Sequence, residues 1–112
     1  MSTTTDQNYD PKTAKAKIVD VTQGTPRTEL TGDQFRLGSD FIASELQLQV
    51  LNKGSHGAAS THEVLGVLEE EMYELKMAIH QNDRKAFLKE LTQIAVACIW
   101  GIASEVGKTL DW

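Results

Sequence analysis

Three stretches of the chain carry apolar residues at helical spacing, and each has residues typical of helix ends. Each stretch follows a residue whose side chain can accept a hydrogen bond from an unpaired helical N–H: Thr31, Ser60 and Asp83. Gln34 and Glu63, three residues after the first two of these, complete capping boxes. Gly54 and Gly107 follow the first and third stretches and are typical of helix C-termini. The pattern therefore predicts three helices.

The apolar positions also predict which face of each helix is buried. In the second stretch they recur in alternating steps of three and four, and the third stretch has a similar stripe. The expected core consists of Leu65, Leu68, Met72, Leu75 and Ile79 on one helix and Phe87, Leu91, Ile94, Cys98 and Ile102 on the next. We expect these two stripes to face each other. The fold class predicted is all-α: a small antiparallel bundle of about three helices.

The chain before the first helix has a different composition. Residues 1–31 are mostly Thr, Gln, Asp and Lys, with too few apolar side chains to offset the entropy of ordering. We expect a flexible, largely irregular arm over 1–31 and a helical domain over 32–112. Within the arm, Lys17–Thr22 has weak strand character.

Composition narrows the class of protein. The formal net charge is −5, which argues against a broad nucleic-acid-binding face. The longest apolar run, Ile94–Trp100, is far shorter than a membrane span. The single cysteine, Cys98, has no partner for a disulfide. We expect a cytoplasmic protein with neither a nucleic-acid nor a membrane partner.

The third predicted helix is apolar nearly all round between Ile94 and Ala103. Three helices of one chain cannot cover that much apolar surface, so we expect a homo-oligomer, either a dimer or a tetramer.

Carboxylates flank the predicted core on two successive helices. Glu71 and Glu74 lie three residues apart, one position behind the apolar stripe of their helix. Glu90 and Gln93 repeat this spacing on the next helix. If the two apolar stripes face each other, these four side chains can converge on one cleft, where like charges would need neutralising. Hard Mg²⁺, with its preference for carboxylate oxygens, is the simplest counter-ion, and Mn²⁺ is the alternative. The competing interpretation is that the acidic run is an ordinary solvated helix face.

The string Glu70-Glu71-Met72-Tyr73-Glu74-Leu75, followed by Glu90-Leu91-Thr92-Gln93, resembles the MazG-type all-α nucleoside triphosphate pyrophosphohydrolases. That superfamily, which includes the dimeric dUTPases, carries Glu-x-x-Glu on one helix and Glu-x-x-Asp on the next. The resemblance covers about residues 60–104. It implies that Glu71, Glu74 and Glu90 bind metal, and that a nucleoside triphosphate is cleaved to a nucleoside monophosphate and pyrophosphate. Glu70 is the leading candidate for the general base.

Gln93 stands where the family has Asp. Its amide oxygen can serve as a fourth metal ligand but contributes no charge, so the cluster holds metal less firmly. Two alternatives to the enzyme therefore stay open. One is a weakened or inactive nucleotide-binding regulator, and the other is a non-catalytic helical oligomerisation module.

Three further residues are candidates for substrate binding. Lys53 lies at the predicted end of the first helix, where it is either a phosphate ligand or an ordinary partner of the helix dipole. Glu45 and Gln49, one turn apart among apolar neighbours, are the polar groups of that helix that we expect to face the pocket.

Overall fold

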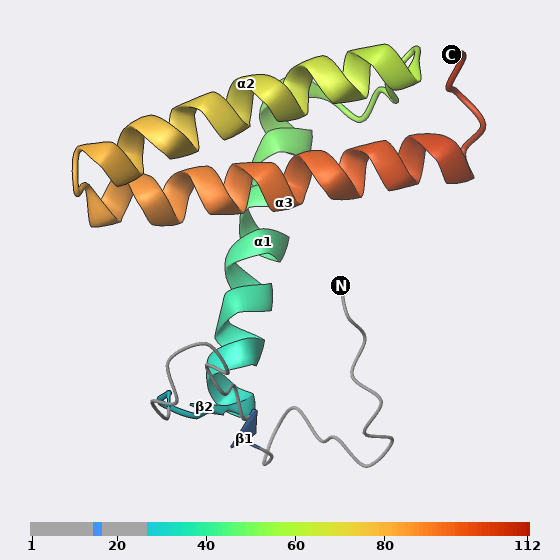
Figure 1. The fold of residues 1–112 in the computed structure, drawn as a ribbon. Helices are drawn as coiled ribbons and strands as arrows, with labels where there is room; N and C mark the ends of the chain where they lie inside the picture. The colour runs from blue at the N-terminus through green and yellow to red at the C-terminus, as the bar shows by residue number, and fades with distance from the viewer. Residues whose placement is uncertain (1–14, 17–26) are drawn as a thin grey trace. The chain divides into compact units, whose positions relative to one another are not determined.

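The computed structural model describes residues 15–16 and 27–112, and almost all of its regular structure is helical (Figure 1). The helices are α1 (Gly32–Lys53), α2 (Thr61–His80) and α3 (Arg84–Val106). Two short strands, β1 (Lys15–Ala16) and β2 (Leu30–Thr31), pair in antiparallel fashion. The predicted all-α fold class is confirmed.

The chain forms two compact units whose boundary lies inside α1. The first is Met1–Asp40 and the second is Phe41–Trp112, so the second unit contains the C-terminal half of α1 together with α2 and α3. In the first unit, Lys15 pairs with Thr31 and Ala16 with Leu30. The strand predicted at residues 17–22 lies outside the described residues, as does most of the predicted arm.

The predicted caps form, with one difference in detail. Thr31 and Gln34 exchange hydrogen bonds of 2.9 and 3.2 Å between side chain and backbone, as a capping box requires. Ser60 accepts from the backbone N–H of Glu63 at 3.1 Å. The Glu63 carboxylate, however, accepts from the backbone N–H of Ala59 at 2.7 Å, one residue before the cap. It therefore fixes the loop before α2 as well as the first turn of the helix.

The helices α2 and α3 lie side by side and antiparallel, joined by the turn at Gln81–Asp83 (Figure 1). Asn82 adopts a left-handed conformation with φ of 55°, which asparagine tolerates well, and Asp83 caps α3 by accepting from Ala86 N–H at 3.0 Å. The helices approach closely near the C-terminal end of α3, where a Cβ on Gly101 would lie 2.9 Å from Cγ1 of Val64.

The faces by which α2 and α3 pack differ from the expected ones. The more buried positions are those that share a row with the carboxylates: Val64, Val67, Glu71 and Ala78 on α2, and Ala86, Glu90, Ala97 and Ser104 on α3. Several members of the predicted core stripes are exposed instead: Leu65, Met72, Ile79, Leu91, Cys98 and Ile102. On each helix the predicted stripe lies next to the buried row, so turning the helix by about 100° about its own axis would bring the stripe to the place of the row.

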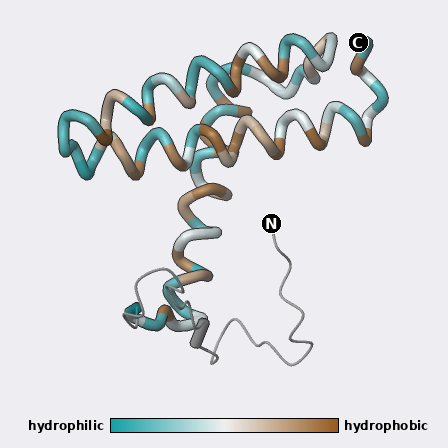
Figure 2. Tube along the Cα trace, in the orientation of Figure 1, coloured by the Kyte–Doolittle hydropathy of each residue, from teal (hydrophilic) through white to brown (hydrophobic). Residues whose placement is uncertain are grey.

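The exposed stripes of α2 and α3 form one continuous apolar face. Each stripe lies one residue after the buried row, and in two antiparallel right-handed helices that offset places both stripes on the same side of the pair. We call this surface, made by Leu65, Leu68, Met72, Leu75, Ile79, Phe87, Leu91, Ile94, Cys98 and Ile102, the apolar face. Figure 2 shows the hydrophobic positions that recur along both helices.

By length and composition alone, α3 is able to cross a membrane. Its most apolar 18-residue stretch has a mean hydropathy of 1.4, and 17% of that stretch is buried inside the described chain. The core helices of soluble proteins meet the same criterion, but they are mostly buried. In α3 the apolar surface is left largely uncovered by the part of the chain that the structure describes.

The last residues of the chain fasten the loop between α1 and α2. Thr61 N–H donates to the Asp111 carbonyl at 2.8 Å, and Asp111 N–H donates to Ala59 at 2.8 Å. Ala58, which is fully buried, donates its N–H to the Ser104 hydroxyl at 2.9 Å. The Trp100 indole N–H donates to the His56 carbonyl of the same loop at 3.0 Å. The N-terminal end of α2 is thereby held against the C-terminal end of α3.

Candidate functional site

Three carboxylates from two helices meet where α2 and α3 pack together. One oxygen from each of Glu71, Glu74 and Glu90 lies within 4.8 Å of the others. We call these three residues the carboxylate triad. Glu71 and Glu74 share a face of α2 because they are three residues apart, and Glu90 projects from the facing row of α3. Of the four side chains expected to converge, the structure therefore brings together Glu71, Glu74 and Glu90.

Two oxygens of the carboxylate triad are buried without a hydrogen-bond partner: Glu71 Oε1 and Glu90 Oε1. Glu90 is only 8% exposed, whereas Glu74 lies at the open edge of the triad. An unpaired buried carboxylate oxygen is costly, because it has given up water without receiving a donor in exchange. While both carboxyls are ionised, neither of these two oxygens has a donor.

The electrostatics of the carboxylate triad favour protonation in the absence of a cation. Burial, a side-chain hydrogen bond with Glu90 and the charges of Glu74, Glu90 and Glu70 raise the pKa of Glu71 to about 7. The pKa of Glu74 is also raised, chiefly by the charge of Glu90 and less by desolvation. The charge of Lys89 acts in the opposite direction and lowers the pKa of Glu74, but less than the other groups raise it.

A hydrogen-bonded network of three polar side chains lies beside the carboxylate triad, on the side of α3 that faces α1. Gln93 Nε2 donates to Glu45 Oε2 at 2.8 Å, and Gln49 Nε2 donates to the same oxygen at 3.3 Å. Gln49 Nε2 also donates to the amide oxygen of Gln93. Glu45 and Gln49 thus face Gln93, and their role in substrate binding stays a prediction.

Gln93 does not join the carboxylate triad in this arrangement. Both ends of its amide are engaged with α1, and a metal ion would have to share the oxygen that accepts from Gln49. Metal binding by Gln93 stays a prediction.

The two remaining candidates lie at the surface. Glu70 is exposed on α2, close enough for its charge to contribute to the raised pKa values of Glu71 and Glu74. Lys53 is exposed in the last turn of α1 and makes none of the hydrogen bonds that join Glu45 and Gln49 to Gln93.

A cavity of about 280 Å³ opens between α1 and α3 next to this network. It is lined by Phe41, Ser44, Glu45, Leu48, Lys85, Leu88, Lys89, Thr92 and Gln93. A somewhat larger cavity, of about 330 Å³, lies at the α2–α3 turn and includes no member of the triad. The smaller cavity is the one that includes Glu45 and Gln93 of the hydrogen-bonded network.

The sequence interpretation missed Lys85 and Lys89. The signal that could have found them is their place in the first two turns of α3, the positive end of the helix dipole, where acidic residues are preferred and the first turn has none. Two cations spaced four residues apart repel each other, and the acidic residue at that end of α3 is the cap, Asp83.

Comparison of the chain with models of known protein families, with curated proteins and with solved structures finds no match. The resemblance to MazG-type enzymes therefore stays a prediction from the motif residues of the sequence.

Proposed function

We propose that the protein is a Mg²⁺-dependent nucleoside triphosphate pyrophosphohydrolase of MazG-like type. The observation that supports this most directly is the pair of buried carboxylate oxygens, Glu71 Oε1 and Glu90 Oε1, which have no donor within a cluster of three acids. A solvated acidic face would leave these oxygens in water. A hard divalent cation matches them, because it takes several carboxylate oxygens and neutralises their mutual repulsion.

In this proposal Glu71, Glu74 and Glu90 hold the metal, Mg²⁺ by preference and Mn²⁺ as the alternative. The bound metal would supply Lewis-acid stabilisation of phosphate oxygens and a more acidic water. Glu70, exposed beside the triad, accepts the proton of the attacking water. The products, a nucleoside monophosphate and pyrophosphate, follow from the family resemblance.

Gln93 is the feature that favours the second candidate, a nucleotide-binding regulator with little or no activity. Its amide is held by Glu45 and Gln49, so the triad carries three acidic groups rather than the four of the family motif. A third candidate, an oligomerisation module, would leave the buried carboxylate oxygens without a role.

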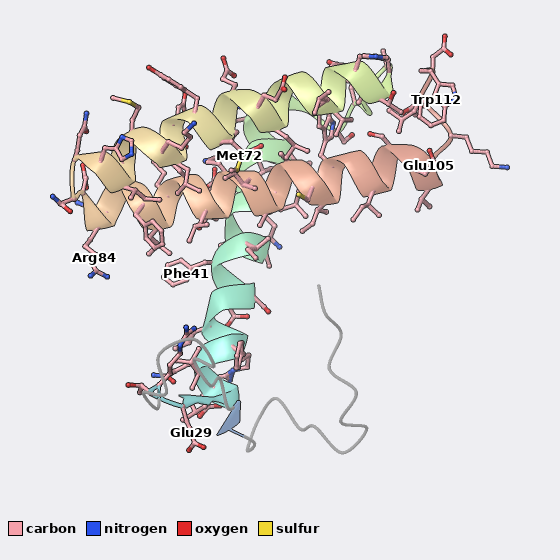
Figure 3. The ribbon with its side chains drawn as sticks, in the orientation of Figure 1. Glu29, Phe41, Met72, Arg84, Glu105 and Trp112 are labelled. Atoms are coloured by element: carbon pink, nitrogen blue, oxygen red, sulfur yellow. The ribbon has the colours of Figure 1, made fainter. Side chains whose placement is uncertain are left out.

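We also propose that two copies of the chain associate through the apolar face, in the cytoplasm. Ile102 is 65% exposed and Met72, labelled in Figure 3, is 45% exposed. Burying such side chains is favourable by roughly 1.5–3 kcal/mol each. An antiparallel pair with one apolar side is suited to a two-fold interface, because each copy presents the same surface.

Metal-dependent stabilisation and pyrophosphate release test the enzyme proposal together. Mg²⁺ is expected to raise the melting temperature of the wild-type chain and of Glu69→Ala, whose exposed carboxylate lies outside the triad. Glu74→Ala should lose this response. Pyrophosphate release is then measured for a panel of nucleoside triphosphates.

Each outcome identifies one of the three candidates. If Mg²⁺ raises the melting temperature, the wild-type chain releases pyrophosphate and Glu74→Ala abolishes both effects, the results support the enzyme. Stabilisation and nucleotide binding without release would establish the regulator instead. A melting temperature that Mg²⁺ leaves unchanged, with no release, would overturn the proposal and favour the oligomerisation module.

A further inference from the structure

Two lysines on α3 line the cavity between α1 and α3. Lys85 and Lys89 are one helical turn apart and contribute to the same wall as Thr92 and Gln93. Phe41, across the cavity on α1, is labelled in Figure 3, where its ring points toward the end of α3 that carries Arg84. Both lysines are exposed, and they share one wall of this open cavity.

The acidic residue in this cavity does not neutralise the lysines. The Glu45 carboxylate receives its hydrogen bonds from the amides of Gln93 and Gln49. Among the described residues, neither Lys85 nor Lys89 lies within ion-pair distance of a carboxylate. Asp83 already caps the N-terminus of α3, so the attraction of this wall for an anion comes from the two lysines.

Lys89 links the cavity to the carboxylate triad. Lys89 directly precedes Glu90 of the triad on α3, whereas Lys85 lies one turn farther toward the N-terminus of the helix. A linear anion with several charged groups would therefore lie along α3. One end would meet a metal ion held by the triad, and the other would meet Lys89 and then Lys85.

The size of the cavity limits what it holds. Its volume of about 280 Å³ lies just below the range of roughly 300–1,000 Å³ that encloses a drug-sized ligand. It accommodates part of a nucleotide rather than the whole molecule. Ammonium groups bind phosphate oxygens through charge-assisted hydrogen bonds, which are stronger than neutral ones.

We propose that Lys85 and Lys89 form a polyphosphate-binding site that receives the phosphate chain of the substrate. The assignment of this anion as substrate rests on the proposed function, whereas binding of the polyphosphate itself depends only on the two lysines. The ligand class is a free linear polyphosphate.

Calorimetric titration of the full chain with inorganic tripolyphosphate tests the site. It is carried out in EDTA at low ionic strength, so that a metal on the triad makes no contribution. Lys85→Gln and Lys89→Gln are each expected to weaken binding about tenfold, the effect of losing one charge-assisted hydrogen bond. The matched control is Lys76→Gln, which removes the same charge from an exposed position on α2 outside the cavity and should leave affinity unchanged.

The failure of this site is distinguishable from that of the enzyme proposal. Unchanged tripolyphosphate affinity in the Lys85→Gln/Lys89→Gln double variant would overturn the site, whatever the pyrophosphate assay shows. Lysine-dependent binding in a protein that neither binds Mg²⁺ nor releases pyrophosphate would support the site and overturn only its link to catalysis. Because α3 is long and apolar, co-sedimentation with phosphatidylglycerol vesicles is measured as well. Lysine-dependent sedimentation that tripolyphosphate does not compete away would assign the site to lipid phosphates and overturn the proposal.

Discussion

Gln93 Nε2 donates a hydrogen bond of 2.8 Å to Glu45 Oε2, which ties the side chain at the motif's fourth position to α1. Where the MazG-type motif has Asp, this chain therefore has a donor that satisfies a neighbouring carboxylate. A substitution that restores the motif does more than add a metal ligand, because it also removes the donor.

We expect Gln93→Asp to destabilise the metal-free protein. The new carboxylate would face Glu45 and leave its Oε2 with only the 3.3 Å bond from Gln49. Losing a hydrogen bond to a charged group costs about 1.5–3 kcal/mol, and like charges add to this cost. Urea denaturation in EDTA measures the change in the free energy of unfolding.

Glu45→Gln provides the control for this substitution. In the Gln93→Asp background it removes the repulsion and should recover most of the lost stability. A Gln93→Asp protein as stable as wild type in EDTA would contradict the described contact.

The stability of the metal-free protein should fall as the pH rises from about 4.5 to above 7. The pKa of Glu71 is raised from 4.5 to about 7, so between these values the folded state binds a proton that the unfolded state has released. Stability decreases with pH wherever the folded state holds more protons. Thermal unfolding in EDTA across this range measures the effect, and Glu71→Gln should flatten the profile.

Mg²⁺ should reverse this trend, because metal competes with protons for the same oxygens. The rise in melting temperature that Mg²⁺ produces is expected to be larger at pH 8 than at pH 5.5. A rise of equal size at both pH values would indicate that the metal acts elsewhere.

Gly101 and Gly66 should respond in opposite ways to alanine. A Cβ at Gly66 meets nothing within 4 Å, so Gly66→Ala should gain up to about 1 kcal/mol of stability from helix propensity. At Gly101 the Cβ would meet Val64 Cγ1 at 2.9 Å, and overpacking costs about 1–3 kcal/mol. Chemical denaturation of both variants measures the difference. An equal gain at both positions would show that α2 and α3 do not approach this closely.

A charge on the apolar face should prevent self-association without unfolding the chain. Ile102→Lys places an ammonium group where a second copy would pack, and the side chain is already 65% exposed. Sedimentation velocity is expected to show a monomer with unchanged helical circular dichroism. The control is Tyr73→Lys, because Tyr73 is 63% exposed on the side of α2 away from α3. An oligomer that persists in Ile102→Lys would place the interface elsewhere.

The sequence predicted the helices, their caps and the meeting of Glu71, Glu74 and Glu90. The helices and their caps depend on local hydrogen bonding, and the shared direction of Glu71 and Glu74 depends on their three-residue spacing within one helix. It did not predict the face by which α2 and α3 pack, because Met72 and Glu71 are neighbours and either row can be turned inward. Nor did it reveal Lys85 and Lys89, since their cavity exists only where the C-terminal half of α1 lies against α3.

The buried rows and the apolar face have a consequence for the evolution of such a chain. Glu74, Lys89 and Gln93 lie on the side of the α2–α3 pair opposite to Met72 and Ile102. Two copies that associate through the apolar face would leave the carboxylate triad and the cavity of each copy accessible to a ligand. Changes in what the protein recognises and changes in how its copies assemble can therefore accumulate separately on the same two helices.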